Sequence, residues 1–353
     1  MKTESLDFFK QLIDSHSPSG YEGDASKVWK KRTANYADKV WVDVHGNTIS
    51  ELNKGKTPRV MIAGHIDEIG YMVNYIDKEG YIYFSAIGGI DTHLVPAQRV
   101  WIKGKKGDVK GVVGRKPIHL QKPDERTKVS KLEEMWIDIG AKSDKEALKL
   151  VDIGDPAVPA VGFEELRGSK VVGRGFDDRS GAFVVSECMR LLKDMKIKAS
   201  VYGVATVQEE IGIRGARTSA FGISPHVGIA VDVTFATDMP GIDKKQIGDI
   251  KLGKGPVISR GPNMNPKVFD LLVETAKKHK IPYQVQGIPS STGTDANFIQ
   301  LNQSGVATGL VSIPNRYMHS PVEMVDIDDL ENTAELISLF ISKLDEKTDY
   351  IPF

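Results

Sequence analysis

The chain has 353 residues, of which 40% are hydrophobic and 27% are charged, so it can form one large core or two domains. Lys and Arg together number 47, as do Asp and Glu, which gives a formal net charge of zero. This balance argues against a protein built mainly to bind nucleic acid or an anionic membrane.

The single cysteine, Cys188, rules out an internal disulfide framework and favours a reducing compartment. It lies in the apolar run GAFVVSECMRLL, which is typical of a core residue rather than a nucleophile. The N-terminus shows no apolar signal region, and no apolar run approaches the roughly 20 residues that span a bilayer. We therefore expect a cytoplasmic protein.

The N-terminal part of the chain predicts two helices, a hairpin and a buried strand. A helix is expected over 4–14, because its apolar residues fall on one face. A second helix is expected over 24–37, and residues 39–52 are typical of a hairpin. The run RVMIAG (59–64) indicates a strand that is buried on both faces, as in the centre of an α/β sheet.

Between residues 72 and 165 the pattern changes to short strand-like runs broken by glycine, such as GYIYFSAIGG and GDVKGVVG. Helical signal is confined to SDKEALKLV. This pattern predicts a compact, mostly β insertion over 72–165.

From residue 170 onward strands and helices alternate. Asp326 is expected to cap the last helix. Such alternation predicts an α/β fold with a mixed, mostly parallel sheet covered by helices on both faces, formed by residues 1–71 and 166–353. Helices are expected over 180–195, 265–280, 293–305 and 326–344, and strands over 198–207, 226–233, 282–288 and 306–313.

Side chains that bind metals follow several of these strands, where the reactive groups of such sheets collect. They are His65 and Asp67, Asp177 and Asp178, Glu209 and Glu210, Asp232, and His319. Any one of them alone is more often a cap, a turn residue or a structural hydrogen-bonding group. Buried together, the carboxylates would repel one another at a cost on the order of several kcal/mol, which divalent cations would offset.

The mixture of imidazole and carboxylate ligands favours Zn²⁺ or Co²⁺, with Mn²⁺ as a further candidate, over Ca²⁺ and Mg²⁺. A catalytic zinc usually takes about three protein ligands and a water molecule, and this set is larger. It fits two metals about 3.5–4 Å apart that share one bridging carboxylate.

Asp67 lies two residues after His65, so in an extended segment both side chains face the same side. Asp67 can then accept the second imidazole N–H and orient the ring, although a turn aspartate is the alternative. Glu209 and Glu210 are neighbours, and neighbours in an extended segment point in different directions. One can bind a metal while the other acts as general base on a metal-bound water.

A series of segments together resembles metallopeptidase family forty-two, the glutamyl-aminopeptidase-like or tetrahedral aminopeptidases, which are sometimes called endoglucanases. The resemblance covers essentially the whole chain in the right order, and the combination is far more specific than any one piece. The segments are AGHIDEIGYMV, GRGFDDRSGA, VQEEIGIRGA, AVDVT, GKGPVISRGPNMNP, GTDANFIQ and IPNRYMHSPVE.

The resemblance implies a di-metal aminopeptidase that removes N-terminal residues from short peptides. One metal would be held by His65, Asp177 and Asp232. The other would be held by Asp177, Glu210 and His319, with Asp177 as the bridging ligand. The inserted residues 72–165 would form a small, PDZ-like β-barrel that makes dimers, and the dimers would assemble into a tetrahedral dodecamer.

The same resemblance makes Glu209 the general base and Asp67 the residue that orients a metal-binding histidine. Thr292 stands where a second glycine is expected in STGTDA, which is expected to alter the substrate pocket. Loops around IRGARTSAFG are expected to shape that pocket. Arg214 and Arg217 are candidates to pair with an acidic substrate side chain, or are solvated or interface residues.

Three alternative functions remain open at this point. A related di-zinc deacylase or carboxypeptidase would use the same metal centre but different substrates. A glycoside hydrolase would need a pair of carboxyl groups about 5–10 Å apart that works without metal. A non-catalytic binding protein would be expected to lack a ligand or the base, and the chain lacks neither.

Overall fold

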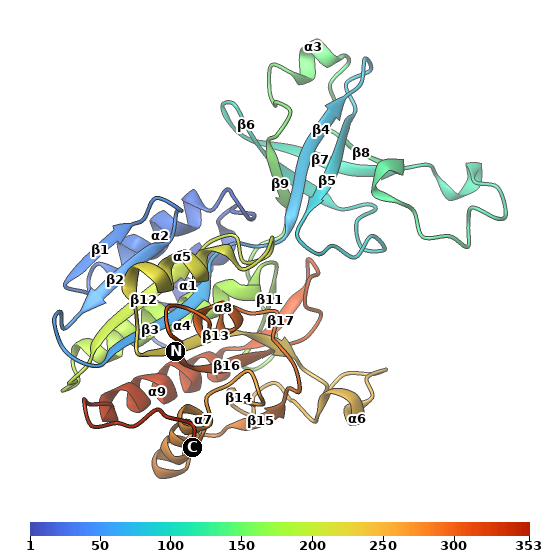
Figure 1. Ribbon diagram of the computed structural model, residues 1–353. Helices are drawn as coiled ribbons and strands as arrows, with labels where there is room; N and C mark the ends of the chain where they lie inside the picture. Colours follow the sequence, from blue (N-terminus) through green and yellow to red (C-terminus); the bar gives the residue numbers. More distant parts are fainter.

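The computed structural model describes residues 1–353 and contains two bodies. Figure 1 shows a helix-covered sheet, which holds both chain termini, and a barrel that projects from one side of it. No helix combines the length and the apolar character that crossing a membrane requires.

The large sheet has eight strands, and its centre is parallel. Strand β3 pairs in parallel with β12 and β13, and β13 pairs in parallel with β16. Antiparallel pairs occur nearer the edges. The order across the sheet is β1 (Lys39–Val42), β2 (Thr48–Leu52), β12 (Ser200–Thr206), β3 (Arg59–His65), β13 (Val227–Phe235), β16 (Ala307–Asn315), β14 (Val257–Arg260) and β15 (Gln284–Gly287).

Helices cover both faces of this sheet. Alternate side chains of its central strands point to opposite faces, so each face forms a hydrophobic core with the helices that cover it. Val60 and Ile62 of β3 belong to the larger core, whereas Met61 and Ala63 belong to a smaller one. The predicted α/β class is therefore confirmed. The larger core contains residues of α1 (Thr3–Asp14), α2 (Gly23–Thr33), α4 (Phe176–Lys193), α7 (Pro266–His279) and α9 (Ile327–Lys343), and the smaller one contains residues of α5 (Arg214–Ile223) and α8 (Ala296–Ile299).

The second body is a closed, antiparallel barrel with its own hydrophobic core. Its strands, in order around the barrel, are β4 (Gly70–Ile76), β5 (Ile82–Ile87), β8 (Met135–Asp138), β7 (Gly107–Arg115), β6 (Arg99–Gly104) and β9 (Pro156–Pro159). The short helices of this part are η1 (Ile118–Leu120), η2 (Leu132–Glu134) and α3 (Asp144–Ala147).

A small sheet of β10 (Glu164–Glu165), β11 (Lys170–Gly173) and β17 (Glu323–Asp326) lies beside the metal-binding residues described below. The sequence did not predict these short strands, nor β14 or α6 (Lys244–Ile247). In the pairing of β17 with β11, Glu323 lies opposite Gly173, which comes shortly before the start of α4.

Three expectations for helices need correction. The helix expected over 293–305 is only α8, a single turn, and α2 ends at Thr33 rather than at residue 37. The segment IRGARTSAFG, which we expected to belong to loops, forms most of α5. Ala216, Ala220 and Ile223 of this segment recur at helical spacing and are buried.

The expectations for Asp326 and Cys188 are confirmed. The Asp326 side chain accepts a hydrogen bond from the backbone N–H of Asp328 and caps α9. Cys188 lies within α4 and is fully buried. Burial raises the pKa of its thiol to about 12, so this cysteine is a core residue rather than a nucleophile.

Candidate metal centre

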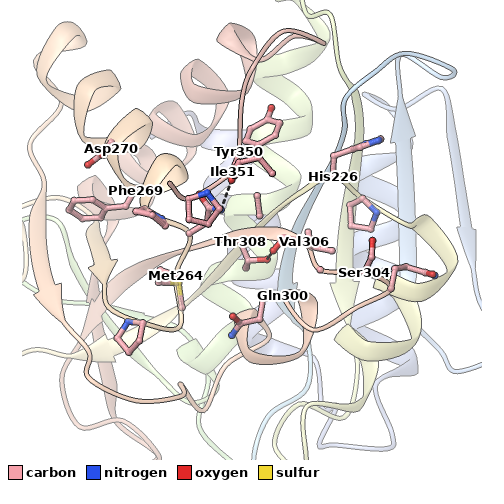
Figure 2. Close-up of a pocket in the computed structure, with 18 of the residues that line it drawn as sticks. His226, Met264, Phe269, Asp270, Gln300, Ser304, Val306, Thr308, Tyr350 and Ile351 are labelled. Carbon is pink, nitrogen blue, oxygen red and sulfur yellow. Dashed lines mark hydrogen bonds between the residues drawn. The ribbon is translucent and has the colours of Figure 1, made fainter.

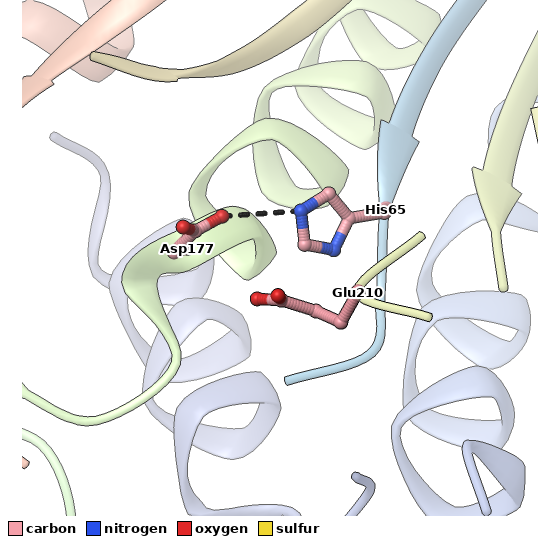
Figure 3. Close-up of side chains that lie close together, drawn as sticks. All are labelled: His65, Asp177 and Glu210. Atoms are coloured by element: carbon pink, nitrogen blue, oxygen red, sulfur yellow. Dashed lines mark hydrogen bonds and ion pairs between the residues drawn. The ribbon is translucent and has the colours of Figure 1, made fainter. Parts of the chain in front are cut away.

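The predicted metal ligands meet at one edge of the large sheet, because β12, β3, β13 and β16 are neighbours and parallel. His65 ends β3, Glu209 and Glu210 follow β12, Asp232 lies in β13, His319 follows β16, and Asp177 lies at the start of α4. Figure 3 shows His65, Asp177 and Glu210 converging from three different segments.

Asp177 lies between the two histidines. Its Oδ1 is 3.1 Å from His65 Nε2, and its Oδ2 is 3.2 Å from His319 Nε2. Glu210 Oε1 lies 3.5 Å from the same nitrogen of His319. A carboxylate whose two oxygens face two separate imidazoles has the arrangement that a bridging ligand requires.

Two groups of three residues could each hold a metal ion, because one ligand atom from each residue lies within 4.8 Å of those of the other two. The first group is His65, Asp177 and Glu210, and the second is His65, Asp178 and Asp232. Asp178 was among the candidate side chains, but not in the ligand set that the family resemblance implied. Its oxygens accept the backbone N–H groups of His65 at 3.1 Å and Gly181 at 2.9 Å, which ties the end of β3 to the start of α4. The two segments approach so closely that a Cβ atom on Gly64 would lie 2.5 Å from the Gly181 carbonyl carbon.

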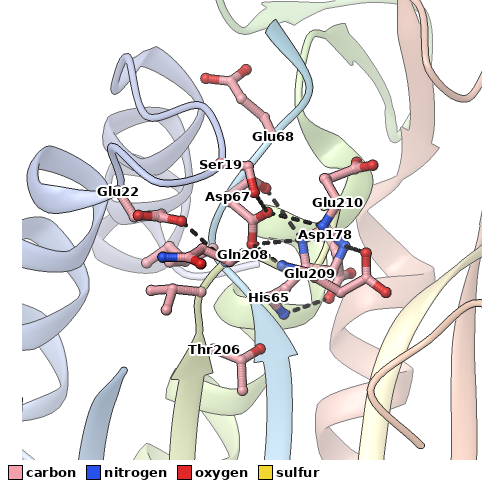
Figure 4. A network of polar contacts seen from close by, with 12 residues as sticks. Ser19, Glu22, His65, Asp67, Glu68, Asp178, Thr206, Gln208, Glu209 and Glu210 are labelled. Carbon is pink, nitrogen blue, oxygen red and sulfur yellow. Dashed lines mark hydrogen bonds and ion pairs between the residues drawn. The ribbon is translucent and has the colours of Figure 1, made fainter. Parts of the chain in front are cut away.

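Asp67 supports both the histidine and the glutamate pair (Figure 4). Its Oδ1 lies 3.5 Å from His65 Nδ1, and its backbone oxygen lies 3.2 Å from the same ring nitrogen. Its two oxygens accept the backbone N–H groups of Glu209 and Glu210, each at 3.1 Å. The Ser19 hydroxyl donates to Asp67 at 2.7 Å. Asp67 therefore holds the backbone of the glutamate pair as well as facing His65.

The carboxylates of Glu209 and Glu210 are incompletely hydrogen-bonded. Glu209 and Glu210 each keep one buried carboxylate oxygen with no hydrogen-bond partner. Burial, together with the charges of Asp232 and other carboxylates, raises the pKa of Glu209 to about 9. Burial and the nearby charge of Asp177 raise the pKa of Glu210 well above its ordinary value. Glu209 Oε2 lies 3.8 Å from His65 Nε2, so it faces the same space as the ligands.

The remaining ligands share this environment. Burial and the charge of Asp177 raise the pKa of Asp232 well above its ordinary value. Burial opposes a charged His65, but contacts with Asp177 and Asp67 outweigh it and raise the pKa of the imidazole. The Asp177 contact likewise raises the pKa of His319. Unpaired buried oxygens and a donor set of imidazoles and carboxylates fit divalent metals, which supply the missing positive charge.

Glu323 on β17 is a residue that sequence reasoning missed. It is buried, and its two oxygens accept the backbone N–H groups of Asp177 and His319, each at 2.9 Å. It therefore links two ligands that come from distant parts of the chain. The only signal in the sequence was its place in HSPVE, four positions after the histidine.

The barrel also contacts the centre through the loop after β5. The backbone of Gly89 hydrogen-bonds the ring of His319. A Cβ atom on Gly88 would lie 2.8 Å from Ile69 and 3.3 Å from the Cβ atom of Glu210, so a larger residue would displace this ligand.

A buried ion cluster fixes the segments on either side of the site. Glu68, the neighbour of Asp67, contacts Arg174 at 2.6 Å and Arg179 at 2.7 Å. Arg179 is fully buried and also donates to backbone carbonyls of α1 and of the loop after α1. The cluster joins the segment after β3 to the start of α4 through charges that are paired and hydrogen-bonded.

A cleft of about 460 Å³ opens beside the centre and is lined by His65, Glu209, Asp232 and His319 together with residues of the 286–294 segment. Thr292 lines this cleft, and its hydroxyl lies 2.8 Å from that of Thr294. Arg214, Arg217 and the rest of α5 are not among its lining residues, whereas Glu209 and Glu210 of the loop before α5 are.

A larger cavity of about 1040 Å³ lies at the opposite edge of the sheet, where β13 and β16 begin (Figure 2). Arg59, His226, Thr308 and Tyr350 are among its lining residues. It contains no carboxylate–histidine cluster of the kind found at the other edge, so size alone does not identify the reactive site.

Fold and site together define a class of metal-dependent hydrolases built on an α/β sheet. The family described as M42 glutamyl aminopeptidase matches residues 46–336, so the chain belongs to this family. A lysyl aminopeptidase of Pyrococcus furiosus is 42% identical over 350 residues, which are 98% of this chain and 99% of that protein.

Solved structures agree with this assignment. A TET aminopeptidase from a marine sediment archaeon of the Thaumarchaeota superposes with a TM-score of 0.93 at 37% identity, covering 98% of this chain and 97% of that one. The TET1 peptidase of Pyrococcus horikoshii, described as able to assemble into a tetrahedron or a large octahedral shell, has a TM-score of 0.86 at 32% identity, covering 96% and 100%. The family and fold resemblance found in the sequence is therefore confirmed.

Because the pKa of Glu209 is raised in the folded protein, we expect the stability of the metal-free protein to depend on pH. The pKa of Glu209 rises from 4.5 to about 9 on folding, so the folded state holds a proton that the unfolded chain has released. Stability is therefore lost as pH rises from 4.5 towards 9. We expect a lower midpoint of thermal unfolding at pH 9 than at pH 6 in chelator, and a smaller difference in Glu209→Gln. Equal midpoints for the parent protein at the two pH values would contradict the electrostatic account.

Replacing Glu323 is expected to weaken metal binding without unfolding the protein. Glu323→Gln replaces one acceptor oxygen by an NH₂ group that faces the N–H of Asp177 or His319. We expect about 10–100-fold weaker Zn²⁺ binding in competition with a chromogenic chelator, and an unchanged circular dichroism spectrum. Glu164→Gln, on exposed β10 of the same small sheet, is the matched control and should bind Zn²⁺ as the parent does. Unchanged affinity in Glu323→Gln would show that Glu323 does not position the ligands.

Proposed function

We propose that this chain is a metal-dependent aminopeptidase that removes N-terminal residues from short peptides. The observation that carries the proposal is the position of Asp177 between His65 and His319, beside Glu209 and Glu210, each of which has one buried oxygen without a hydrogen bond. Membership of an aminopeptidase family supports the same reading.

The residues suit two divalent ions, Zn²⁺ or Co²⁺ with Mn²⁺ as a further candidate. One ion would be held by His65, Asp177 and Asp232, and the other by Asp177, Glu210 and His319. Bound metals of this kind polarise a carbonyl and lower the pKa of water. Asp178 lies close to the first set, but both its oxygens accept backbone N–H groups, which favours a positioning role for it.

Glu209 is the residue of the chain that would move the proton. Its carboxylate faces the ligands but has one free buried oxygen, so it can accept a proton from attacking water. Asp67 would keep this base in place through the backbone N–H of Glu209.

We further propose that residues 72–165 form the dimerisation domain and that the chain assembles into a homo-oligomer, with a tetrahedral dodecamer as the expected form. The Pyrococcus horikoshii relative supports this, because it is described as forming a tetrahedron or an octahedral shell. Light scattering on the intact protein distinguishes a dimer from a dodecamer.

Glu209→Gln separates the base from the ligands. We expect it to retain its metal content while kcat for an aminoacyl anilide falls by roughly 100-fold to 10,000-fold, because the proton acceptor is lost. Glu210→Ala and His319→Ala should instead lose metal, as measured by elemental analysis. A kcat for Glu209→Gln within a factor of two or so of the parent would contradict the assignment of the base.

Two comparisons make this test specific. Glu164→Gln should keep both metal and kcat, since this residue lies on the exposed β10 strand. An N-acetylated anilide should be a poor substrate, whereas a deacylase would prefer it to the free amine. Hydrolysis of cellulose oligomers by chelator-treated protein would favour a glycoside hydrolase instead.

A further inference from the structure

The cleft beside the metal centre is electrically neutral apart from the centre itself. Six ionisable side chains line it, and all of them belong to the candidate metal centre: His65, Asp177, Glu209, Glu210, Asp232 and His319. The other lining residues have neutral side chains. Lys244, two positions before the lining residue Gln246, is paired with Asp249 at 2.7 Å.

Several polar side chains of this lining are hydrogen-bonded to neighbours. The Thr234 hydroxyl donates to Gln286 Oε1 at 2.9 Å, across the cleft wall formed by β13 and β15. The hydroxyl groups of Thr292 and Thr294 are 2.8 Å apart, and Asn263 donates to Thr292 at 3.3 Å. None of the polar side chains outside the metal centre carries a charge that could pair with a charged ligand group.

Apolar side chains make up much of the remaining surface, and they come from four separate segments. They are Val233, Phe235, Ile247, Ile288, Leu310 and Met318. Phe235, at the end of β13, is 51% exposed and so presents apolar surface at the cleft. Such a wall gains free energy by burying an apolar side chain.

A second, much smaller cavity adjoins the centre on the far side of Asp177 and His319. Its volume is only about 20 Å³, close to that of a single water molecule, so it is too small for a side chain. A substrate with its α-amine and scissile carbonyl at the metal centre can instead place its first side chain in the neutral cleft.

Resting on the proposed aminopeptidase activity, we infer that the chain prefers peptides whose N-terminal side chain is neutral and apolar, such as leucine. A lysyl or glutamyl side chain would lose hydration in this cleft without meeting an opposite charge outside the metal centre. The names of related proteins include lysyl and glutamyl aminopeptidases, but each of those preferences calls for a charged partner that this cleft does not offer.

The test compares leucyl, lysyl and glutamyl anilides on the assembled, Zn²⁺-loaded and Co²⁺-loaded protein. We expect kcat/KM for the leucyl substrate to exceed each of the others by at least about 100-fold, the scale on which a pocket rejects an unpaired charge. Equal or higher kcat/KM for the lysyl or glutamyl anilide overturns the inference.

A charge placed in the cleft provides a second, independent measurement. Gln286→Glu keeps an acceptor oxygen for Thr234 and adds a carboxylate to the wall, so it should raise the lysyl-to-leucyl ratio of kcat/KM by at least about 10-fold. Gln303→Glu adds the same charge at the larger cavity on the opposite sheet edge and should leave the ratio unchanged. An equal ratio in Gln286→Glu and the parent would contradict this location of the side-chain pocket.

The outcomes separate the two proposals. If no free-amine anilide is cleaved by the metal-loaded protein, the proposed aminopeptidase function fails. If anilides are cleaved in a metal-dependent way but a charged residue is preferred, the function stands and only the neutral-pocket inference fails.

Discussion

The structure depends on one electrostatic constraint, a group of buried carboxylates at the carboxyl edge of the large sheet. Asp177, Glu209, Glu210 and Asp232 lie there with only two imidazoles as nearby candidates for positive charge. Burial raises the pKa of three of these acids, which shows how poorly the chain alone balances them. The divalent cations proposed above would balance these charges and at the same time supply the chemistry of a hydrolase.

Much of the surrounding architecture holds this charged group in place through backbone contacts. Asp67 accepts the N–H groups of the glutamate pair, and Glu323 accepts those of Asp177 and His319. The ion cluster of Glu68 with two buried arginines ties together the same segments, and the barrel contributes the Gly88–Gly89 contact. These contacts fix where the ligands lie, which matters because small displacements weaken a metal site.

The sequence predicted the α/β sheet and the mostly β segment, because hydrophobic periodicity is a local signal, and it named candidate metal-binding residues that the fold brings close together. It did not predict β11 or β17, since strands this short have little periodicity. Glu323 was missed for the same reason, because its role depends on the pairing of β17 with β11. The neutrality of the cleft could not be predicted, because it depends on segments from 232 to 319 that only the fold brings together.

The central claim is that two metals, bridged by Asp177, balance the buried carboxylates. Anomalous diffraction at the zinc absorption edge, from crystals of the Zn²⁺-loaded protein, tests it most directly. The account predicts two peaks about 3.5–4 Å apart, one beside His65 and Asp232 and the other beside Glu210 and His319, both in contact with Asp177. A single peak, or peaks that do not touch Asp177, would contradict it.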